Sequence, residues 1–278
     1  MEKTLVAITG ASSGIGEAFA RKLAPGHDLL LIARRQDRLQ ALADEFANKF
    51  ETRTEILQAD LTKDDELETA VERLATEQRL SLLVNNAGFG TRGRFWEAEL
   101  TSQEKMHKLH VMATVRLTHA ALRNMVRRDF GGIVNVASVS SFVRSPGTTS
   151  YSATKAWMSA FTEGLHLELK GARSSVVVQA LCPGFTYSEF QEAMGVGRQN
   201  AMGPGWWLTS EEVVDASIEG LRRRKLFVIP GWRYKFLVGL LTRLPTSLRL
   251  QVESMGGPAR VRRLPVNIDT RKKIASED

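Results

Sequence analysis

The sequence has few of the residues that stabilise small secreted domains or cross membranes. It contains one cysteine, Cys182, in 278 residues, which excludes both an internal disulfide framework and a zinc site built from several cysteines. The apolar stretch at residues 236–242 is far shorter than the roughly 20 residues that a membrane-spanning helix needs. The first apolar run, residues 5–8, leads directly into a glycine-rich turn, so we expect no secretion signal. We therefore expect a cytoplasmic protein in a reducing compartment.

Charge is plentiful but unevenly distributed. The formal net charge is +7. Residues 1–220 carry 24 lysines and arginines against 27 aspartates and glutamates, whereas residues 221–278 carry 14 against 4. A near-neutral body argues against a nucleic-acid-binding protein, which concentrates basic residues on its folded surface. The basic tail instead points to a local anionic partner or surface.

Short apolar runs alternate with longer stretches that repeat apolar residues at helical spacing. Because hydrophobic residues make up 43% of the chain, it can bury one large core. Continuous apolar runs separated by helical spacers are typical of a parallel sheet covered on both faces. We predict an α/β fold with a doubly wound parallel sheet of the Rossmann type, as one domain over residues 1–230 with a helical extension over 231–278. The predicted strands are residues 5–8, 29–33, 54–57, 82–84, 133–136, 176–181 and 226–229.

A segment rich in helix-breaking residues lies before the end of the predicted domain. It contains Gly195, Gly197, Gly203, Pro204 and Gly205. Such a cluster predicts a mobile loop within the domain.

A glycine-rich turn, Thr-Gly-Ala-Ser-Ser-Gly-Ile-Gly at residues 9–16, follows the first predicted strand. Glycine permits a sharp turn and a close approach of the backbone to a pyrophosphate, whose charge is stabilised at a helix N-terminus. The sequence therefore predicts a dinucleotide site, with an ordinary glycine turn as the alternative. The candidate binding residues are Gly10, Ser12, Ser13, Gly14, Ile15 and Gly16.

Two arginines, Arg34 and Arg35, follow the second predicted strand, where folds that prefer NAD place a carboxylate for the ribose 2′-hydroxyl. A guanidinium pairs with a 2′-phosphate, which a carboxylate would repel. The pattern favours NADP(H) over NAD(H); the alternative is that both arginines only begin a solvated helix. Asp60 and Leu61 follow the third predicted strand, where the Asp60 carboxylate would accept a hydrogen bond from the adenine amine.

Three polar residues form the candidate catalytic group. Tyr151 and Lys155 are four residues apart, which places them on one face of a helix. A nearby ammonium favours phenolate, so we expect the pKa of Tyr151 to be lowered toward working pH, where the phenol exchanges a proton with a carbonyl or alcohol oxygen. Ser138 ends the fifth predicted strand, and its hydroxyl can bind the same oxygen.

The order of these motifs, with Asn-Asn-Ala-Gly at residues 85–88 and Pro-Gly at 183–184, resembles the classical short-chain dehydrogenase/reductase family over about residues 4–230. The resemblance implies a single-domain Rossmann fold and hydride transfer between a nicotinamide and a carbonyl or alcohol. It also implies a homo-oligomer, usually a dimer or tetramer.

The same resemblance implies roles for individual residues. Tyr151 would be the general acid or base, Lys155 would lower its pKa and bind the nicotinamide ribose, and Ser138 would hold the substrate oxygen. Further cofactor contacts are implied for Asn86, Ala87, Gly88, Pro183, Gly184, Thr186 and Ser188.

His110 departs from the family pattern, which has an asparagine there to support a water in the proton relay. Histidine donates and accepts hydrogen bonds and titrates near neutrality. One interpretation is that His110 replaces the asparagine or gates activity by pH; the other is that it is a packed helical histidine. The remaining histidines lack metal-site spacing, so we expect no metal.

The aromatic and basic residues of the C-terminal third leave several interpretations open. Trp206 and Trp207 either line an apolar substrate pocket or simply pack. Beyond residue 231, apolar residues recur at helical spacing among basic neighbours. The interpretations of this extension are contact with a membrane surface, attraction of an acidic substrate or carrier protein, and packing on the protein or a subunit partner, which we favour. The apolar residues are Trp232, Phe236, Leu237, Leu240, Leu241 and Leu244.

The motifs together predict an NADPH-dependent oxidoreductase that acts on a small carbonyl or alcohol substrate of apolar character. The alternative is a catalytically slow NADP(H)-binding regulatory or interaction module that uses the tail as its contact surface. Retention of Ser138, Tyr151 and Lys155 favours the enzyme, and His110 is the one feature that favours the alternative.

Overall fold

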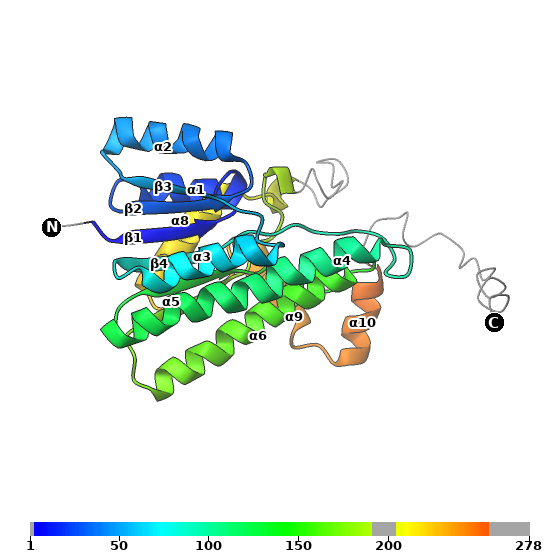
Figure 1. The fold of residues 1–278 in the computed structure, drawn as a ribbon. Coiled ribbons are helices and arrows are strands. Elements are labelled where there is room, and N and C mark those ends of the chain that lie inside the picture. The colour runs from blue at the N-terminus through cyan, green and yellow to red at the C-terminus, as the bar shows by residue number, and fades with distance from the viewer. Residues whose placement is uncertain (1–2, 191–203, 256–278) are drawn as a thin grey trace, which may run out of the picture.

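The computed structural model describes residues 3–190 and 204–255. It contains a seven-stranded sheet in the order β3-β2-β1-β4-β5-β6-β7, in which every neighbouring pair is parallel. Helices cover both faces of the sheet (Figure 1). The fold prediction is confirmed, and each predicted strand is found. The strands are β1 Leu5–Thr9, β2 Asp28–Ala33, β3 Thr54–Gln58, β4 Leu80–Asn85, β5 Gly132–Val136, β6 Val177–Leu181 and β7 Phe227–Val228.

The helices follow the strands along the chain. The α-helices are α1 Gly14–Leu23, α2 Gln36–Phe50, α3 Asp64–Thr76, α4 Leu100–His107, α5 Thr114–Arg128, α6 Thr149–Gly171, α8 Ser210–Arg222, α9 Trp232–Leu241 and α10 Thr246–Met255. A π-helical turn, η1 Lys108–Ala113, joins α4 to α5, and short 3₁₀ turns form at η2 Val139–Ser141 and η3 Pro204–Trp206.

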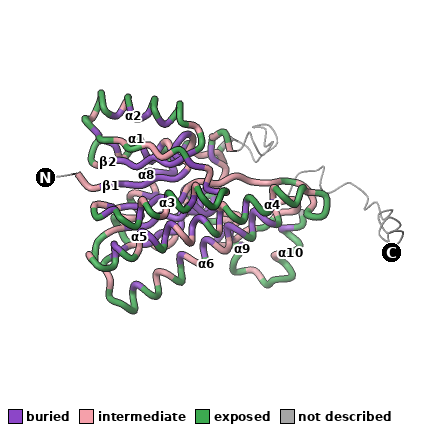
Figure 2. The backbone as a smooth tube through the Cα atoms, viewed as in Figure 1, coloured by how far each residue is buried: buried purple, intermediate pink, exposed green. Residues whose placement is uncertain are grey.

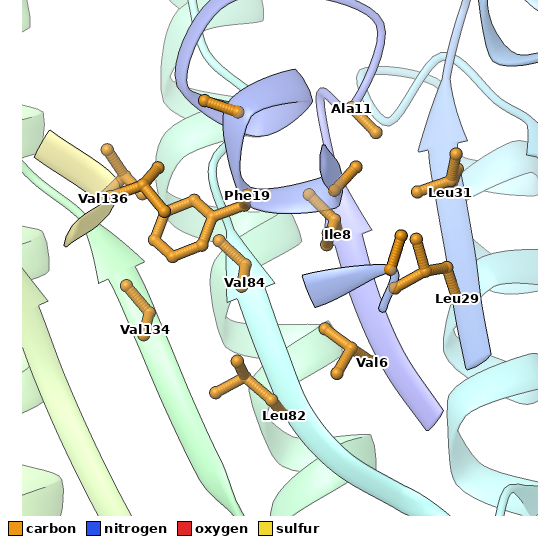
Figure 3. Close-up of a cluster of buried hydrophobic side chains, with 14 of the residues drawn as sticks. Val6, Ile8, Ala11, Phe19, Leu29, Leu31, Leu82, Val84, Val134 and Val136 are labelled. Carbon is orange, nitrogen blue, oxygen red and sulfur yellow. The ribbon is translucent and has the colours of Figure 1, made fainter. Parts of the chain in front are cut away.

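Alternate residues of each central strand enter different cores, as side chains on the two faces of a sheet must. In β1, Val6 and Ile8 pack in a cluster with α1, α2 and α8, whereas Leu5 and Ala7 pack in a cluster with α3, α5 and α6. All residues of β1 and β2 are buried, which explains their uninterrupted apolar sequences. Figure 3 shows Phe19 of α1 lying among side chains of the cluster that contains Val6 and Ile8.

Burial is concentrated in the strands and the inner sides of the helices, while the outer side of α2 and the C-terminal end of α6 are exposed (Figure 2). The order of the strands reverses between β1 and β4, because β2 and β3 lie on one side of β1 and β4 to β7 on the other. In such sheets, ligands bind at the carboxyl ends of the strands beside this reversal.

Most of the predicted mobile loop lies outside the described residues, including Gly195, Gly197 and Gly203. The part of the extension that is described forms α9 and α10. Among residues 3–190 and 204–255, none of the helices combines the length and apolarity needed to cross a bilayer. The same residues contain no group of three His, Cys, Asp or Glu side chains placed to hold a metal ion.

Candidate active site

A cleft opens where the carboxyl ends of the central strands meet. Of the candidate site residues, only Gly16 and His110 are absent from the described residues that line it. Those that line it are Gly10, Ser12, Ser13, Gly14, Ile15, Arg34, Arg35, Asp60, Leu61, Asn86, Ala87, Gly88, Ser138, Tyr151, Lys155, Pro183, Gly184, Thr186 and Ser188.

The glycine-rich turn forms the floor of the cleft between β1 and α1. Gly10 has a φ of +67°, and a side chain there would meet the Asn86 amide at 2.8 Å and the Ala87 Cα at 2.9 Å. Gly16 lies below the turn, where a Cβ would collide with the carbonyl oxygen of Gly10. The turn therefore requires glycine at both positions. The backbone it exposes at the N-terminus of α1 fits a pyrophosphate.

Thr9 connects the two strand ends between which the cleft opens. Its hydroxyl accepts hydrogen bonds from the backbone N–H groups of Asn86 and Ala87, both at 2.9 Å, and donates one to the Val84 carbonyl at 3.3 Å. The Asn86 amide donates to the carbonyls of Thr9 and Gly10 at 2.9 and 3.2 Å. Asn86 therefore connects to the glycine turn through these two hydrogen bonds and also lines the cleft.

The two arginines after β2 have different surroundings. Arg35 donates to the hydroxyls of Ser12 and Ser13 at 3.2 and 2.8 Å and forms an ion pair of 2.7 Å with Glu189. Arg34 is exposed at the cleft, and its guanidinium has no hydrogen bond or ion pair within the described part of the chain. Arg34 is therefore the guanidinium available to a 2′-phosphate, while Arg35 braces the turn. The sequence did not indicate Glu189, which also pairs with Arg38.

Asp60 lies at the end of β3 as expected for an adenine contact. Burial tends to raise the pKa of its carboxyl, but hydrogen bonds from the Thr62 N–H and hydroxyl, together with the charge of Arg34, outweigh burial and lower the pKa. The Thr62 bonds are 3.0 and 2.8 Å long, and both end on one oxygen, Oδ1. The other carboxylate oxygen is left to accept from a ligand.

Ser138, Tyr151 and Lys155 meet at the centre of the cleft. Tyr151 and Lys155 lie in α6 and are 8% and 4% exposed. The Lys155 Nζ is 5.9 Å from the centre of the Tyr151 ring and donates to the Val136 carbonyl at 2.7 Å. The Ser138 side chain is close enough to the Tyr151 phenol to act on its pKa, which it lowers. The structure therefore brings the three predicted catalytic side chains together.

The expected lowering of the Tyr151 pKa is not found. Burial raises the pKa of Tyr151 to about 12, with the hydrogen bond to Ser138 acting in the opposite direction. Burial also lowers the pKa of Lys155 to about 8. Both side chains are almost fully enclosed. Burial disfavours the charged form of each, so the pKa of the phenol rises and the pKa of the ammonium falls.

His110 is fully buried in the π-helical turn η1. Its Nε2 accepts the Phe89 N–H at 3.3 Å, and its Nδ1 lies 2.9 Å from the Thr154 hydroxyl, which itself donates to the Tyr151 carbonyl at 2.9 Å. Burial, with the nearby charge of Lys155, holds the pKa of His110 well below its usual value. Both ring nitrogens are thus used inside the protein, which favours the packed-histidine interpretation.

The loop after β6 closes the cleft on the side opposite the glycine turn. Ser188 faces this turn, since a Cβ on Gly14 would lie 3.1 Å from the Ser188 Cβ. Tyr234 of α9 packs against Gly184 and accepts the Phe185 N–H at 2.9 Å. The sequence did not indicate this contribution of the extension, because nothing in the spacing connects residue 234 with residue 184.

Of the two interpretations of Trp206 and Trp207, the structure favours simple packing, because neither is among the described residues that line the cleft. Trp207 stacks on Tyr187 with ring centres 4.9 Å apart, and Trp206 meets Tyr234 edge-on at 5.2 Å. The apolar part of the lining near Tyr151 comes from other residues. These are Phe89, Leu109, Phe185 and Phe190, with the hydroxyls of Ser145 and Thr148 beside them.

Comparisons with known proteins agree with this geometry. A family model described as short chain dehydrogenase matches residues 4–198. The 3-oxoacyl-(acyl-carrier-protein) reductase FabG of Aquifex aeolicus is 34% identical over 180 residues, covering 64% of this chain and 72% of that protein.

Solved structures of dehydrogenases are similar to this chain over more of its length. A short-chain dehydrogenase from Sphingobium yanoikuyae in complex with NADPH is 35% identical, with a TM-score of 0.78 and coverage of 88% of this chain and 97% of that one. The bulky-bulky ketone specific alcohol dehydrogenase from Comamonas testosteroni is 32% identical, with a TM-score of 0.75 and coverage of 89% and 97%.

The glycine turn yields a direct test of the cleft. We expect Gly16→Ala to weaken NADPH binding by about tenfold or more, because forcing a methyl group into a packed site costs roughly 1–3 kcal/mol. Gly26→Ala is the matched control, since a Cβ there would meet nothing within 4 Å. The measurement is a fluorescence titration with NADPH, and equal affinity of the Gly16→Ala variant and the unmutated protein would contradict the assignment.

Proposed function

The chain belongs to the short chain dehydrogenase family of oxidoreductases, and from that premise we propose that it is an NADP(H)-dependent carbonyl reductase for an apolar substrate, able to run in reverse as an alcohol dehydrogenase. The observation that carries the proposal is the enclosure of Ser138, Tyr151 and Lys155 in the same cleft as the glycine-rich turn. A proton donor is thereby held next to a site suited to a dinucleotide.

The proton chemistry follows from the surroundings of Tyr151. Its pKa of about 12 keeps the phenol protonated at neutral pH, so it is ready to donate to an oxygen that becomes negative as a carbonyl is reduced. The Ser138 hydroxyl, which lines the same cleft as the phenol, would orient that oxygen. The nicotinamide cofactor, when bound, supplies the hydride.

Lys155 would act as an anchor and a source of positive charge. One of its three N–H bonds is directed to the Val136 carbonyl, which leaves two for the ribose hydroxyls of a cofactor. Its ammonium would also stabilise negative charge that develops on the Tyr151 oxygen as the proton leaves.

The preference for NADP(H) rests on Arg34. It projects at the cleft end of β2 after Ala33, a position without a carboxylate. The similar chain from Sphingobium yanoikuyae, 35% identical, is described in complex with NADPH, which supports the same choice here.

The apolar substrate class rests on the phenylalanines beside Tyr151. The ring centres of Phe190 and Tyr151 are 5.9 Å apart, and Phe89 and Phe185 also line the cleft. The similar alcohol dehydrogenase from Comamonas testosteroni is described as specific for bulky-bulky ketones, which is consistent with an apolar carbonyl compound. The alternative of a slow regulatory module loses its main support, because His110 is occupied by packing.

Removal of the phenol hydroxyl tests the proposed proton donor. We expect Tyr151→Phe to lower kcat/KM for reduction of aldehydes or ketones by about 10²–10⁴-fold, the usual worth of a positioned general acid, while NADPH still binds. Tyr187→Phe, at a tyrosine stacked on Trp207, is the control and should retain activity. Full turnover by Tyr151→Phe would refute the assignment; tight NADPH binding by an unmutated protein with no turnover would favour the regulatory module.

The pH profile tests the role of Lys155. Its ammonium is protonated below its pKa of about 8 and neutral above it, whereas Tyr151 remains protonated over this range. We therefore expect kcat/KM for NADPH-dependent reduction to be constant in mildly acidic to neutral buffer and to decline above about pH 8. A rate that rises through this region would show that the neutral amine is the active form.

Cofactor selectivity tests the role of Arg34. A charged hydrogen bond is worth about 1.5–3 kcal/mol, so Arg34→Ala should reduce the preference for NADPH over NADH, measured as the ratio of kcat/KM values, by about 10- to 100-fold. Arg38→Ala is the matched control, because Arg38 pairs with Glu189 and is absent from the described cleft lining. Equal use of both cofactors by the unmutated protein would refute the preference.

A further inference from the structure

Helix α9 carries apolar side chains on more than one side, but only one side of it packs on the protein. Tyr234, Val238 and Leu241 are buried. Trp232 is 71% exposed, Phe236 67% and Leu240 49%. These three are four residues apart and therefore form one line along the outside of the helix. We call Trp232, Phe236 and Leu240 the outer stripe.

The structure divides the six apolar residues that the sequence analysis assigned to one stripe. Three of them form the outer stripe, and Leu241 is the one that is buried. Single exposed apolar residues are ordinary, whereas a line that combines an indole, a phenyl ring and an isobutyl group indicates a contact surface.

The charges around the outer stripe are of one sign. Arg233, Lys235 and Arg243 are exposed beside it. The one acidic residue in residues 231–255 is Glu253, which is 6% exposed and accepts the Arg144 N–H at 3.2 Å. The described surface of α9 and α10 is therefore positive, with no exposed carboxylate of its own.

A second copy of the chain fits this surface poorly. A two-fold contact would bring the outer stripe against itself and place the basic residues of both copies together. An anionic bilayer would bind both the outer stripe and the basic residues beside it. Aromatic and aliphatic groups enter the boundary between headgroups and acyl chains, while lysine and arginine contact phosphates.

We propose that the outer stripe of α9 binds the surface of an anionic phospholipid bilayer, with Lys235 and Arg243 at the lipid phosphates. The contact is peripheral and goes beyond the proposed reductase activity, on which it does not depend. In Figure 1, α9 and α10 lie outside the seven-stranded sheet.

Helices α9 and α10 are hydrogen-bonded to loops that line the cleft. The Tyr234 hydroxyl joins the Phe185 N–H to the Trp206 carbonyl, with bonds of 2.9 and 2.6 Å. Glu253 of α10 accepts the backbone N–H of Arg144, which precedes Ser145 in the same loop. Both Phe185 and Ser145 line the cleft. If the proposed function holds, a bilayer bound at the outer stripe lies near the apolar part of the cleft.

Vesicle binding by the full chain tests the proposal. We expect the protein to co-sediment with vesicles of phosphatidylglycerol and phosphatidylcholine, to release as salt is raised, and to bind vesicles of phosphatidylcholine alone much more weakly. The triple variant Trp232→Ser, Phe236→Ser, Leu240→Ser should lower the partition coefficient on the order of tenfold or more. Lys235→Gln with Arg243→Gln should remove much of the salt dependence.

A matched control uses apolar residues exposed elsewhere on the surface. Val126, Phe130 and Leu167 are 40%, 54% and 62% exposed, and replacing all three with serine should leave vesicle binding unchanged. Unaltered NADPH binding would show that the stripe variant is folded. A second measurement avoids the triple substitution: brominated phosphatidylglycerol should quench the tryptophan fluorescence of the unmutated protein more than that of Trp232→Phe.

Three results would overturn the proposal. The first is no binding of the unmutated protein to anionic vesicles. The second is binding that survives the triple stripe variant, which would place the lipid contact elsewhere. The third is an oligomer, seen by light scattering, that dissociates in the stripe variant while vesicles bind neither protein; the stripe would then be a subunit interface.

Discussion

The cleft exists because two neighbouring parallel strands, β1 and β4, lead to crossover helices on opposite faces of the sheet. The Thr9 hydroxyl holds this junction by bonding the backbone of residues 86 and 87. It thereby brings the glycine turn and the Asn-Asn-Ala-Gly segment so close that Gly10 has no room for a side chain. The cofactor-binding geometry that we propose depends on this junction, since a shift of either strand end would separate the turn from the rest of the cleft.

Burial then determines the protonation of the proposed catalytic group. The phenol of Tyr151 and the ammonium of Lys155 lie within one turn of α6, and each is almost completely enclosed. In water, the ammonium would favour phenolate; inside the cleft, burial dominates and favours a neutral phenol. A neutral phenol is the form that a reductase needs, because the substrate oxygen gains a proton as its carbon gains hydride. His110, which titrates near neutrality in water, is kept neutral by the same physical cause.

The sequence predicted the strands well, and most of the candidate site residues line one cleft, because both results depend on local patterns. Uninterrupted apolar runs identify buried parallel strands, and motifs at strand ends must meet at one edge of the sheet. Long-range pairings have no such signal: Glu189 binds Arg35 from 154 residues away, and Tyr234 supports the loop at Gly184. The Tyr151 pKa could not be predicted, since spacing reports proximity and not burial. The sequence also did not indicate which side of α9 is exposed, because apolar residues occur on more than one side of that helix.

The central claim is that Tyr151 is a neutral proton donor poised beside the cofactor site. Carbon-13 NMR of protein labelled at tyrosine Cζ tests it directly, because the chain has three tyrosines and comparison with Tyr151→Phe identifies the resonance. The account predicts a phenol signal for Tyr151 through neutral and mildly alkaline pH, with ionisation only toward pH about 12. A phenolate signal at neutral pH would contradict it.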